Sequence, residues 1–179
     1  VLRKIVSDIP QMEKLGLPDA VKEAIKLKNG LILVTGQTGS GKSTSLAAMI
    51  DQINSSRAEN IITIEDPIEF VHPSKKSIVS QREVGKDTGS FARALKSALR
   101  QDPDVILVGE MRDLETISLA LTAAETGHLV FGTLHASNVS STITRILDVF
   151  PPAQKTLAQS MLAGSIRLVL SQQLLKKKG

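Results

Sequence analysis

The chain has 179 residues, of which 41% are hydrophobic and 22% charged, and its formal net charge is +4. This composition is that of a globular protein with one full core, and no apolar run approaches the ~20 residues of a membrane-spanning helix. The lack of cysteine excludes disulfides and thiolate metal sites. The chain contains four Phe and no Trp or Tyr, which disfavours a protein that stacks single-stranded nucleic acid on aromatic side chains.

The first segment, residues 1–17, is predicted to be an interdomain linker, because Pro10 and Gly16 interrupt it. Residues 18–179 are predicted to form a single domain. Its first element is expected to be a helix over 18–28, with a proline and an acid in the first turn.

A buried strand is predicted over 31–35, and the run that follows it, Gly36–Ser43, has the pattern G-x-x-x-x-G-K-[ST]. A helix is expected directly afterwards. This order is that of a P-loop, whose glycines let backbone N–H groups surround a phosphate at a helix N-terminus. In a P-loop the lysine reaches the β- and γ-phosphates and the following hydroxyl ligates Mg²⁺. We therefore predict that the chain binds a nucleoside triphosphate with Mg²⁺, through Gly36, Thr38, Gly39, Ser40, Gly41, Lys42, Ser43 and Thr44.

Three further buried strands are predicted from short apolar runs, at 61–64, 105–108 and 129–134. Between the first two of these, Ile68–Val71 and Ser77–Gln81 are expected to form a small β-hairpin outside the main sheet, with His72 on the surface of its loop. Ser90 is expected to cap the helix that follows it. The other helices are predicted over 114–126, 139–149 and 154–162, while 165–175 fits either a helix or a strand.

Strands that alternate with helices predict an α/β fold with a mainly parallel sheet. Ligands of such a sheet bind at the carboxyl ends of its strands. Polar residues follow each of the four predicted strands at that point, namely the P-loop, Glu65–Asp66, Gly109–Glu110 and His135. These strand ends therefore predict one active site at one edge of the sheet.

Hydrolysis of a triphosphate requires a carboxylate that orients or deprotonates the attacking water. Glu110 is the best candidate, because an apolar strand that ends in an acid is the Walker B arrangement. Gly109 stands where that arrangement has a second carboxylate, and the acidic cluster that follows residue 64 can supply it. A solvated acidic turn is the alternative interpretation of this cluster. The sequence leaves open which acid is the base and which holds Mg²⁺; the candidate bases are Glu110, Glu69 and Glu65, and the candidate metal ligands are Ser43, Glu110 and Asp66.

Histidines and arginines provide further candidates. His135 ends a strand and is predicted either to sense the γ-phosphate or to be a structural residue. His128 follows a helix C-terminus, where a cation is favoured regardless of function. An arginine that stabilises the transition state can come from the same subunit or from a neighbouring one, and the candidates for this role are Arg82, Arg112 and Arg145. A solvated position is the alternative for each of them.

Four stretches resemble the Walker A, Asp box, Walker B and His box of the type II/type IV secretion ATPase superfamily, in the same order and with the same spacing: 36–43, 64–69, 99–113 and 126–135. Within the superfamily, the members that retract type IV pili are the most similar, over 109–113, 124–135 and 145–151. The extension and secretion motors often carry a four-cysteine zinc module, which a chain without cysteine cannot form.

The resemblance implies that the predicted parallel sheet and its flanking helices form a RecA-like P-loop NTPase core, in which the predicted β-hairpin is a small insertion. It implies a homohexamer that hydrolyses ATP with Mg²⁺ to depolymerise pilin, and so powers twitching motility. The implied location is cytoplasmic, at the inner-membrane face, with a pilus platform protein as partner and neither nucleic acid nor a membrane-spanning segment. The resemblance also implies catalytic acids at Glu110 and Glu69 and functional roles for His128 and His135. Together with the candidates above, the predicted catalytic set is Glu110, Glu69, Glu65, His135 and Arg112, and His128 joins the nucleotide-binding set.

Other functions fit the same motifs. One is a motor for pilus extension or type II secretion, and another is a RecA-like nucleic-acid motor, because the fold alone does not decide function. A third is an assembly module that binds nucleotide without turning it over. Superfamily members also carry an N-terminal PAS-like domain and a C-terminal helical region that this sequence lacks, so the chain is expected to be the core of a larger protein.

Overall fold

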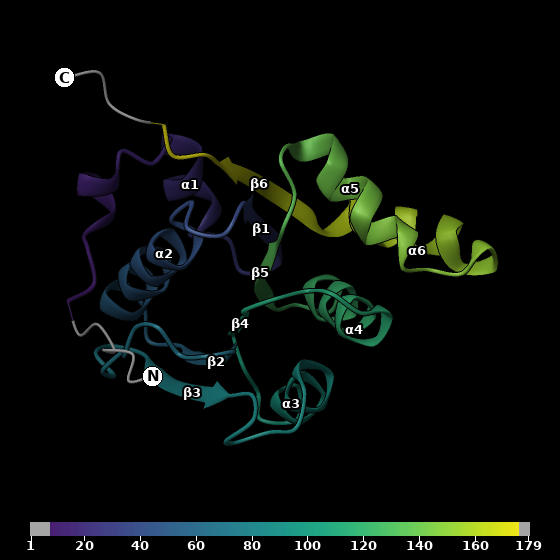
Figure 1. Ribbon diagram of the computed structural model, residues 1–179. Helices are drawn as coiled ribbons and strands as arrows, with labels where there is room; N and C mark the ends of the chain where they lie inside the picture. The colour runs from purple at the N-terminus through teal and green to yellow at the C-terminus, as the bar shows by residue number, and fades with distance from the viewer. Residues whose placement is uncertain (1–7, 176–179) are drawn as a thin grey trace.

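The computed structural model describes residues 8–175, and its centre is a six-stranded parallel sheet with the strand order β3-β2-β4-β5-β1-β6 (Figure 1). Every residue of the central strands β1, β4 and β5 is buried. Their largely apolar runs follow from this position, because helices cover both faces of a parallel sheet. The strands are β1 (Gly30–Gly36), β2 (Asn60–Glu65), β3 (Ile78–Glu83), β4 (Val105–Val108), β5 (Leu129–Leu134) and β6 (Ile166–Gln172).

Helices lie on both sides of this sheet, with α1 and α2 on one side and α3 and α4 on the other (Figure 1). The side chains of β1 alternate between two cores, because successive residues of a strand point to opposite faces. Ile32 and Val34 belong to the core on the α2 side, and Leu31 and Leu33 to the core on the α4 side. The helices are η1 (Met12–Leu15, a 3₁₀-helix), α1 (Asp19–Ala24), α2 (Lys42–Ser56), α3 (Phe91–Ala98), α4 (Leu114–Glu125), α5 (Val139–Asp148) and α6 (Pro152–Ser165). None of the helices within residues 8–175 combines the length and the apolar character needed to cross a bilayer.

The predicted fold class is confirmed, since the sheet is parallel and flanked by helices. Strands are present in all four of the predicted ranges, and the ambiguous range 165–175 contains β6. Ser90 caps α3 as predicted, with its side chain accepting a hydrogen bond from the backbone N–H of Arg93.

The predicted β-hairpin outside the sheet is wrong. Residues 78–83 instead form β3, which pairs in parallel with β2 at the edge of the main sheet. Ile68–Val71 lies in the loop, residues 66–77, that connects these two strands. Two apolar runs close together in sequence suggested local antiparallel pairing. The connecting loop is long enough for the crossover of about a dozen residues that parallel pairing requires.

The described part of the predicted linker packs onto the domain. Met12 in η1 is 3% exposed and belongs to the core on the α2 side. Residues 1–7 of the predicted linker lie outside the described residues. The division of the chain at residue 17 stays a prediction.

Candidate nucleotide-binding and catalytic site

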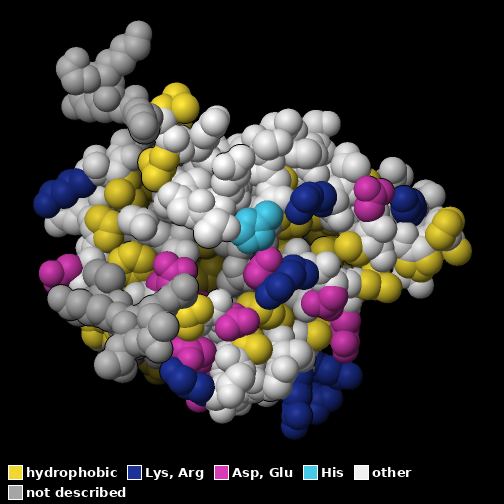
Figure 2. Space-filling model, viewed as in Figure 1, with side chains coloured by type: hydrophobic (Ala, Val, Ile, Leu, Met, Phe, Trp, Pro, Cys, Tyr) yellow, Lys and Arg dark blue, Asp and Glu magenta, His cyan; other side chains and the backbone are white. Residues whose placement is uncertain are grey.

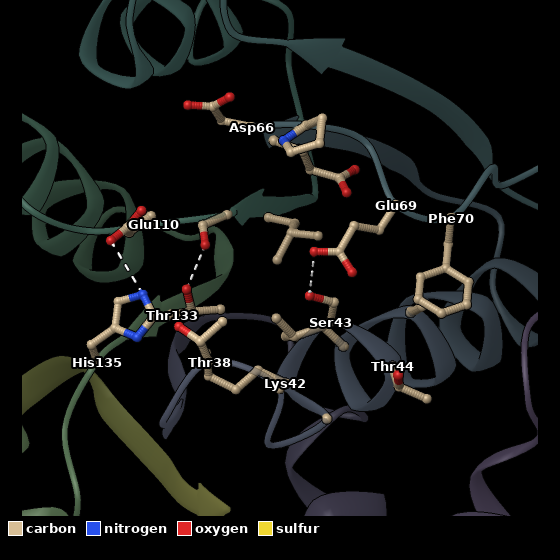
Figure 3. Close-up of a pocket in the computed structure, with 18 of the residues that line it drawn as sticks. Thr38, Lys42, Ser43, Thr44, Asp66, Glu69, Phe70, Glu110, Thr133 and His135 are labelled. Carbon is tan, nitrogen blue, oxygen red and sulfur yellow. Dashed lines mark hydrogen bonds and ion pairs between the residues drawn. The ribbon is translucent and has the colours of Figure 1, made fainter. Parts of the chain in front are cut away.

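A cavity of about 500 Å³ lies at the carboxyl edge of the sheet (Figure 3). It is lined by residues from the P-loop after β1, the loop after β2, the end of β4 and the end of β5. The rule that ligands bind at the carboxyl ends of parallel strands therefore predicted the location of the cavity. The predicted site residues that line it are Thr38, Gly39, Gly41, Lys42, Ser43, Thr44, Glu65, Asp66, Glu69, Glu110 and His135.

The P-loop presents the N-terminus of α2 to this cavity. Gly41, the N-cap of α2, has a φ of +90° and makes no side-chain cap. Glycine is favoured there because other residues rarely adopt this left-handed backbone. Gly36 is required for space, since a Cβ at this position would lie 2.4 Å from the carbonyl oxygen of Gln172. The backbone N–H groups of the first turn and the positive end of the helix dipole make this terminus suited to phosphate.

Lys42 lies in the first turn of α2, and its side chain folds back onto the P-loop. Its Nζ donates hydrogen bonds to the carbonyl oxygens of Gly36 at 3.0 Å and Gln37 at 2.8 Å. Burial lowers the pKa of the ammonium group, while the negative charges of Glu110 and Glu69 act in the opposite direction. The cation is therefore held beside the phosphate-binding backbone by neutral carbonyls.

Two acids of the cluster after β2 have different surroundings. The Oε1 atom of Glu69 accepts a hydrogen bond from Ser43 Oγ at 3.0 Å (Figure 3). Glu65 is more enclosed, and its Oε1 accepts hydrogen bonds from Thr63 Oγ1 at 2.7 Å and Gln81 Nε2 at 3.2 Å. Burial raises the pKa of the Glu65 carboxyl, and these hydrogen bonds offset part of that effect. One acid thus faces the P-loop helix, and the other is held in a more enclosed position.

The carboxylate of Glu110, directly after β4, lies between two nitrogen-bearing side chains. Its Oε2 is 3.0 Å from Arg112 Nη2, and its Oε1 is 3.6 Å from His135 Nε2. On this face of the molecule acidic and basic side chains lie together with a histidine (Figure 2). Thr133 Oγ1 donates to the carbonyl oxygen of Gly109, which fixes the backbone that leads to Glu110. A carboxylate held in this way at a cavity wall is suited to orienting a water molecule.

Some predicted residues do not join this cavity. His128 precedes β5, at the opposite edge of the sheet, and its Nδ1 is 3.0 Å from the carbonyl oxygen of Ala123. Gly36 and Ser40 instead line a smaller depression on the other side of the P-loop, together with Gln172.

The three arginines considered as fingers differ in position. Arg112 contacts the carboxylate of Glu110, and its side chain is 65% exposed. Arg82, in the edge strand β3, donates a hydrogen bond to Gln101 Oε1 at 2.6 Å. Arg145 lines a depression next to the P-loop together with His135. Arg112 and Arg145 are therefore the two that lie beside the site.

Sequence reasoning missed several residues that line the cavity. Thr133 is the next-to-last residue of β5, so the strand-end rule could have identified it. Phe70 and Phe91 gave no signal beyond their apolar character. The prediction that His72 lies on a loop surface is wrong, because this residue is 6% exposed and lines the cavity. Burial lowers the pKa of its imidazole. Its burial depends on how the loop packs, which local spacing does not specify.

Oxygen atoms suited to Mg²⁺ line the cavity, since both hydroxyl groups and carboxylates face it. Mg²⁺ prefers such oxygen ligands and is usually bound through one or two protein groups together with substrate phosphates. Within residues 8–175, no cluster of three or more His, Asp or Glu side chains is arranged to hold a metal ion by itself. The predicted metal ligands Ser43, Asp66 and Glu110 all line the cavity, and their oxygen atoms fit Mg²⁺ bound with a triphosphate.

Comparison with known proteins relates the chain to one family. Residues 2–178 match the family described as type II/IV secretion system protein. The chain is 60% identical over 179 residues to the type IV pilus retraction ATPase PilT of Pseudomonas aeruginosa, covering 100% of this chain and 52% of that protein. It is 59% identical over 176 residues to a twitching motility protein of Neisseria gonorrhoeae, covering 98% of this chain and 47% of that protein.

A solved structure supports the same relationship. The crystal structure of the pilus retraction motor PilT with bound ADP matches with a TM-score of 0.94 and 60% identity, covering 97% of this chain and 50% of that chain. The chain thus spans about half the length of these relatives.

Proposed function

This chain belongs to the type II/IV secretion system protein family, and we propose that it is the ATP-hydrolysing core of a motor that retracts type IV pili. The observation that carries the proposal is that four strand ends place the P-loop, Glu65–Asp66, Glu110 and His135 around one cavity. Nucleotide binding alone requires only the P-loop and the helix behind it. Acids on the facing wall are what hydrolysis requires in addition.

Nucleotide binding is assigned to the P-loop and the first turn of α2. The backbone N–H groups around Gly39 and Gly41 would bind the phosphates at the positive end of the helix dipole. Lys42 would exchange its hydrogen bonds with the Gly36 and Gln37 carbonyls for bonds to phosphate oxygens. Charge-assisted bonds of this kind are roughly twice as strong as those between neutral groups, so the exchange favours the bound state.

Water activation is assigned to Glu110. Its carboxylate would orient the attacking water and accept its proton, while Arg112 and His135 hold the carboxylate in place. Arg112 is exposed enough to contact the γ-phosphate or a neighbouring subunit. Thr133 donates a hydrogen bond to the carbonyl oxygen of Gly109, and this bond keeps Glu110 in place directly after β4.

Metal binding is assigned to Ser43 Oγ, with Asp66 and Glu110 as the candidate carboxylates. Mg²⁺ bound with ATP supplies neutralisation of the negative charge on the β- and γ-phosphates. Glu69 acts as the second acid of the site through its hydrogen bond to Ser43. Glu65 supports the loop that carries Glu69.

Family membership supports the assembly that we propose. We assign the motor to a homohexamer at the cytoplasmic face of the inner membrane, where it works on a pilus platform protein. His128 does not line the nucleotide cavity of its own subunit. Any contact between His128 and nucleotide would therefore be made in the cavity of a neighbouring subunit. The relatives of highest identity reported above are named for retraction and twitching motility, which favours retraction over pilus extension.

Two experiments test the proposal. The protein expressed from the complete gene should release phosphate from ATP in the presence of Mg²⁺ and not in the presence of EDTA. If it binds ATP and releases no phosphate, the alternative of a non-hydrolysing assembly module is correct. Cells that lack the gene should carry excess pili that do not retract, whereas cells without pili would identify an extension motor.

A further inference from the structure

We propose that Gln81 is a positioning residue of this site, which holds the loop after β2 so that Glu69 reaches the P-loop helix. The inference rests on the proposed function. Gln81 lies in the edge strand β3 and is not among the residues that line the cavity. Its contribution must therefore pass through the residues that it holds.

The amide group of Gln81 makes three hydrogen bonds to this region. Its Nε2 donates to Glu65 Oε1 at 3.2 Å and to the carbonyl oxygen of Phe70 at 2.9 Å. Its Oε1 accepts from the backbone N–H of His72 at 2.8 Å. A side-chain amide can donate two bonds and accept at the same time, and an aliphatic side chain of the same size can do neither.

These contacts enclose Glu69 on both sides along the chain. Glu65 comes before Glu69, and the two backbone groups of Phe70 and His72 come after it. Between them, the carboxylate of Glu69 accepts the hydrogen bond from Ser43 at 3.0 Å. The loop segment that carries the acid is therefore fixed to a strand of the sheet at both of its ends.

The strand β3 provides a second anchor nearby, because the N–H of Ile68 donates to Glu83 Oε2 at 3.1 Å. The later part of the loop is held by a different element. Asn54 of α2 donates to the carbonyl oxygen of Pro73 at 2.8 Å and accepts from the N–H of Lys75 at 3.0 Å. Loss of the Gln81 amide should therefore loosen residues 66–72 and leave the rest of the loop attached to α2.

Within residues 8–175, no hydrogen bond joins Gln81 to the P-loop. Nucleotide binding should therefore not depend on this residue. Hydrolysis should depend on it, because displacement of a catalytic group by about 1 Å can cost roughly 100-fold in rate. The expected signature is a change in kcat without a matching change in affinity.

The test compares two variants of the protein expressed from its complete gene. Gln81→Met removes the amide while keeping a side chain of similar size. Gln101→Met makes the same chemical change at a different residue. The side chain of Gln101 accepts a hydrogen bond from Arg82, which follows Gln81 in β3, and this change leaves the hydrogen bonds of the loop in place. We expect Gln81→Met to lower kcat by roughly 10- to 100-fold, with the Kd for ADP within about threefold of wild type. Gln101→Met should change neither quantity.

A double-mutant cycle distinguishes positioning from general loss of fold. If Gln81 acts through Glu69, adding Gln81→Met to Glu69→Ala should not lower kcat further, because the two effects share one route. Losses that multiply in the double variant, or a wild-type kcat for Gln81→Met alone, would overturn the proposal.

Hydrogen–deuterium exchange provides a measurement that does not depend on hydrolysis. The amides of residues 66–72 should exchange faster in Gln81→Met than in wild type or in Gln101→Met. Unchanged exchange would refute the positioning role. A wild-type protein that releases no phosphate would refute the proposed function instead, and the exchange rates would still decide whether Gln81 holds the loop.

Discussion

The hydroxyl of Ser43 donates a hydrogen bond to Glu69 across 3.0 Å, which joins the first turn of α2 to the loop after β2. A serine hydroxyl has one proton to donate and two lone pairs with which to accept. With its proton directed at Glu69, the oxygen of Ser43 keeps its lone pairs for a cation. If Ser43 ligates Mg²⁺ as we propose, Glu69 would do more than add negative charge, because it would orient the hydroxyl of Ser43 toward the cation.

Lys42→Ala should abolish tight nucleotide binding. The variant loses a partly buried ammonium that would otherwise bind phosphate oxygens. Hydrogen bonds to charged groups contribute about 1.5–3 kcal/mol, so the Kd for ATP should rise by roughly 10- to 150-fold. Titration with a fluorescent nucleotide measures this change. Lys26→Ala is the matched control, because Lys26 is exposed and pairs with Glu23 outside the cavity. Wild-type affinity of Lys42→Ala would contradict the site assignment.

Glu110→Gln should retain nucleotide binding and lose hydrolysis. The amide keeps the size of the side chain, but it cannot accept the proton of the attacking water. General-base catalysis contributes about 10²- to 10⁴-fold, so kcat for phosphate release should fall by that factor. Glu125→Gln, at the end of α4 and away from the cavity, is the control for removal of one negative charge. Normal turnover by Glu110→Gln would show that another acid is the base.

The sequence predicted the fold and most of the residues that line the cavity, because both depend on local patterns. Apolar runs located the central strands, and the glycines with Lys42 identified the P-loop. Pattern failed at the edge of the sheet. Ile78, at the start of β3, is 68% exposed, so this strand lacks the buried apolar run that marks the central ones. The contact of Glu69 with Ser43 and the burial of His72 both depend on loop packing between distant segments, which spacing along the chain does not contain.

His72 should make the stability of the protein fall as the solution becomes acidic. Burial lowers the pKa of its imidazole below the ordinary value of 6.5, so between the folded-state pKa and 6.5 the folded protein binds fewer protons than the unfolded chain. The free energy of unfolding should therefore be fully maintained above pH 6.5 and decrease as the pH falls from there. In His72→Gln this decrease should be smaller. Urea unfolding at a series of pH values, without nucleotide, measures it, and equal slopes in the two proteins would contradict the prediction.

Glu65 should have the opposite effect, because it is an acid whose pKa is raised by burial above the ordinary value of 4.5. Well below pH 4.5, the carboxyl is protonated in both the folded and the unfolded chain. As the pH rises through 4.5, the unfolded chain releases this proton first, so the folded state holds more protons and loses stability until its own pKa is passed.

Glu65→Gln removes this loss, and its amide oxygen can still accept the hydrogen bonds from Thr63 and Gln81. The variant should therefore gain stability relative to wild type as the pH rises, measured by urea unfolding in EDTA without nucleotide. Taking the difference between the two proteins at each pH removes the contribution of His72. A variant that loses stability relative to wild type over the same range would show that ionised Glu65 stabilises the fold.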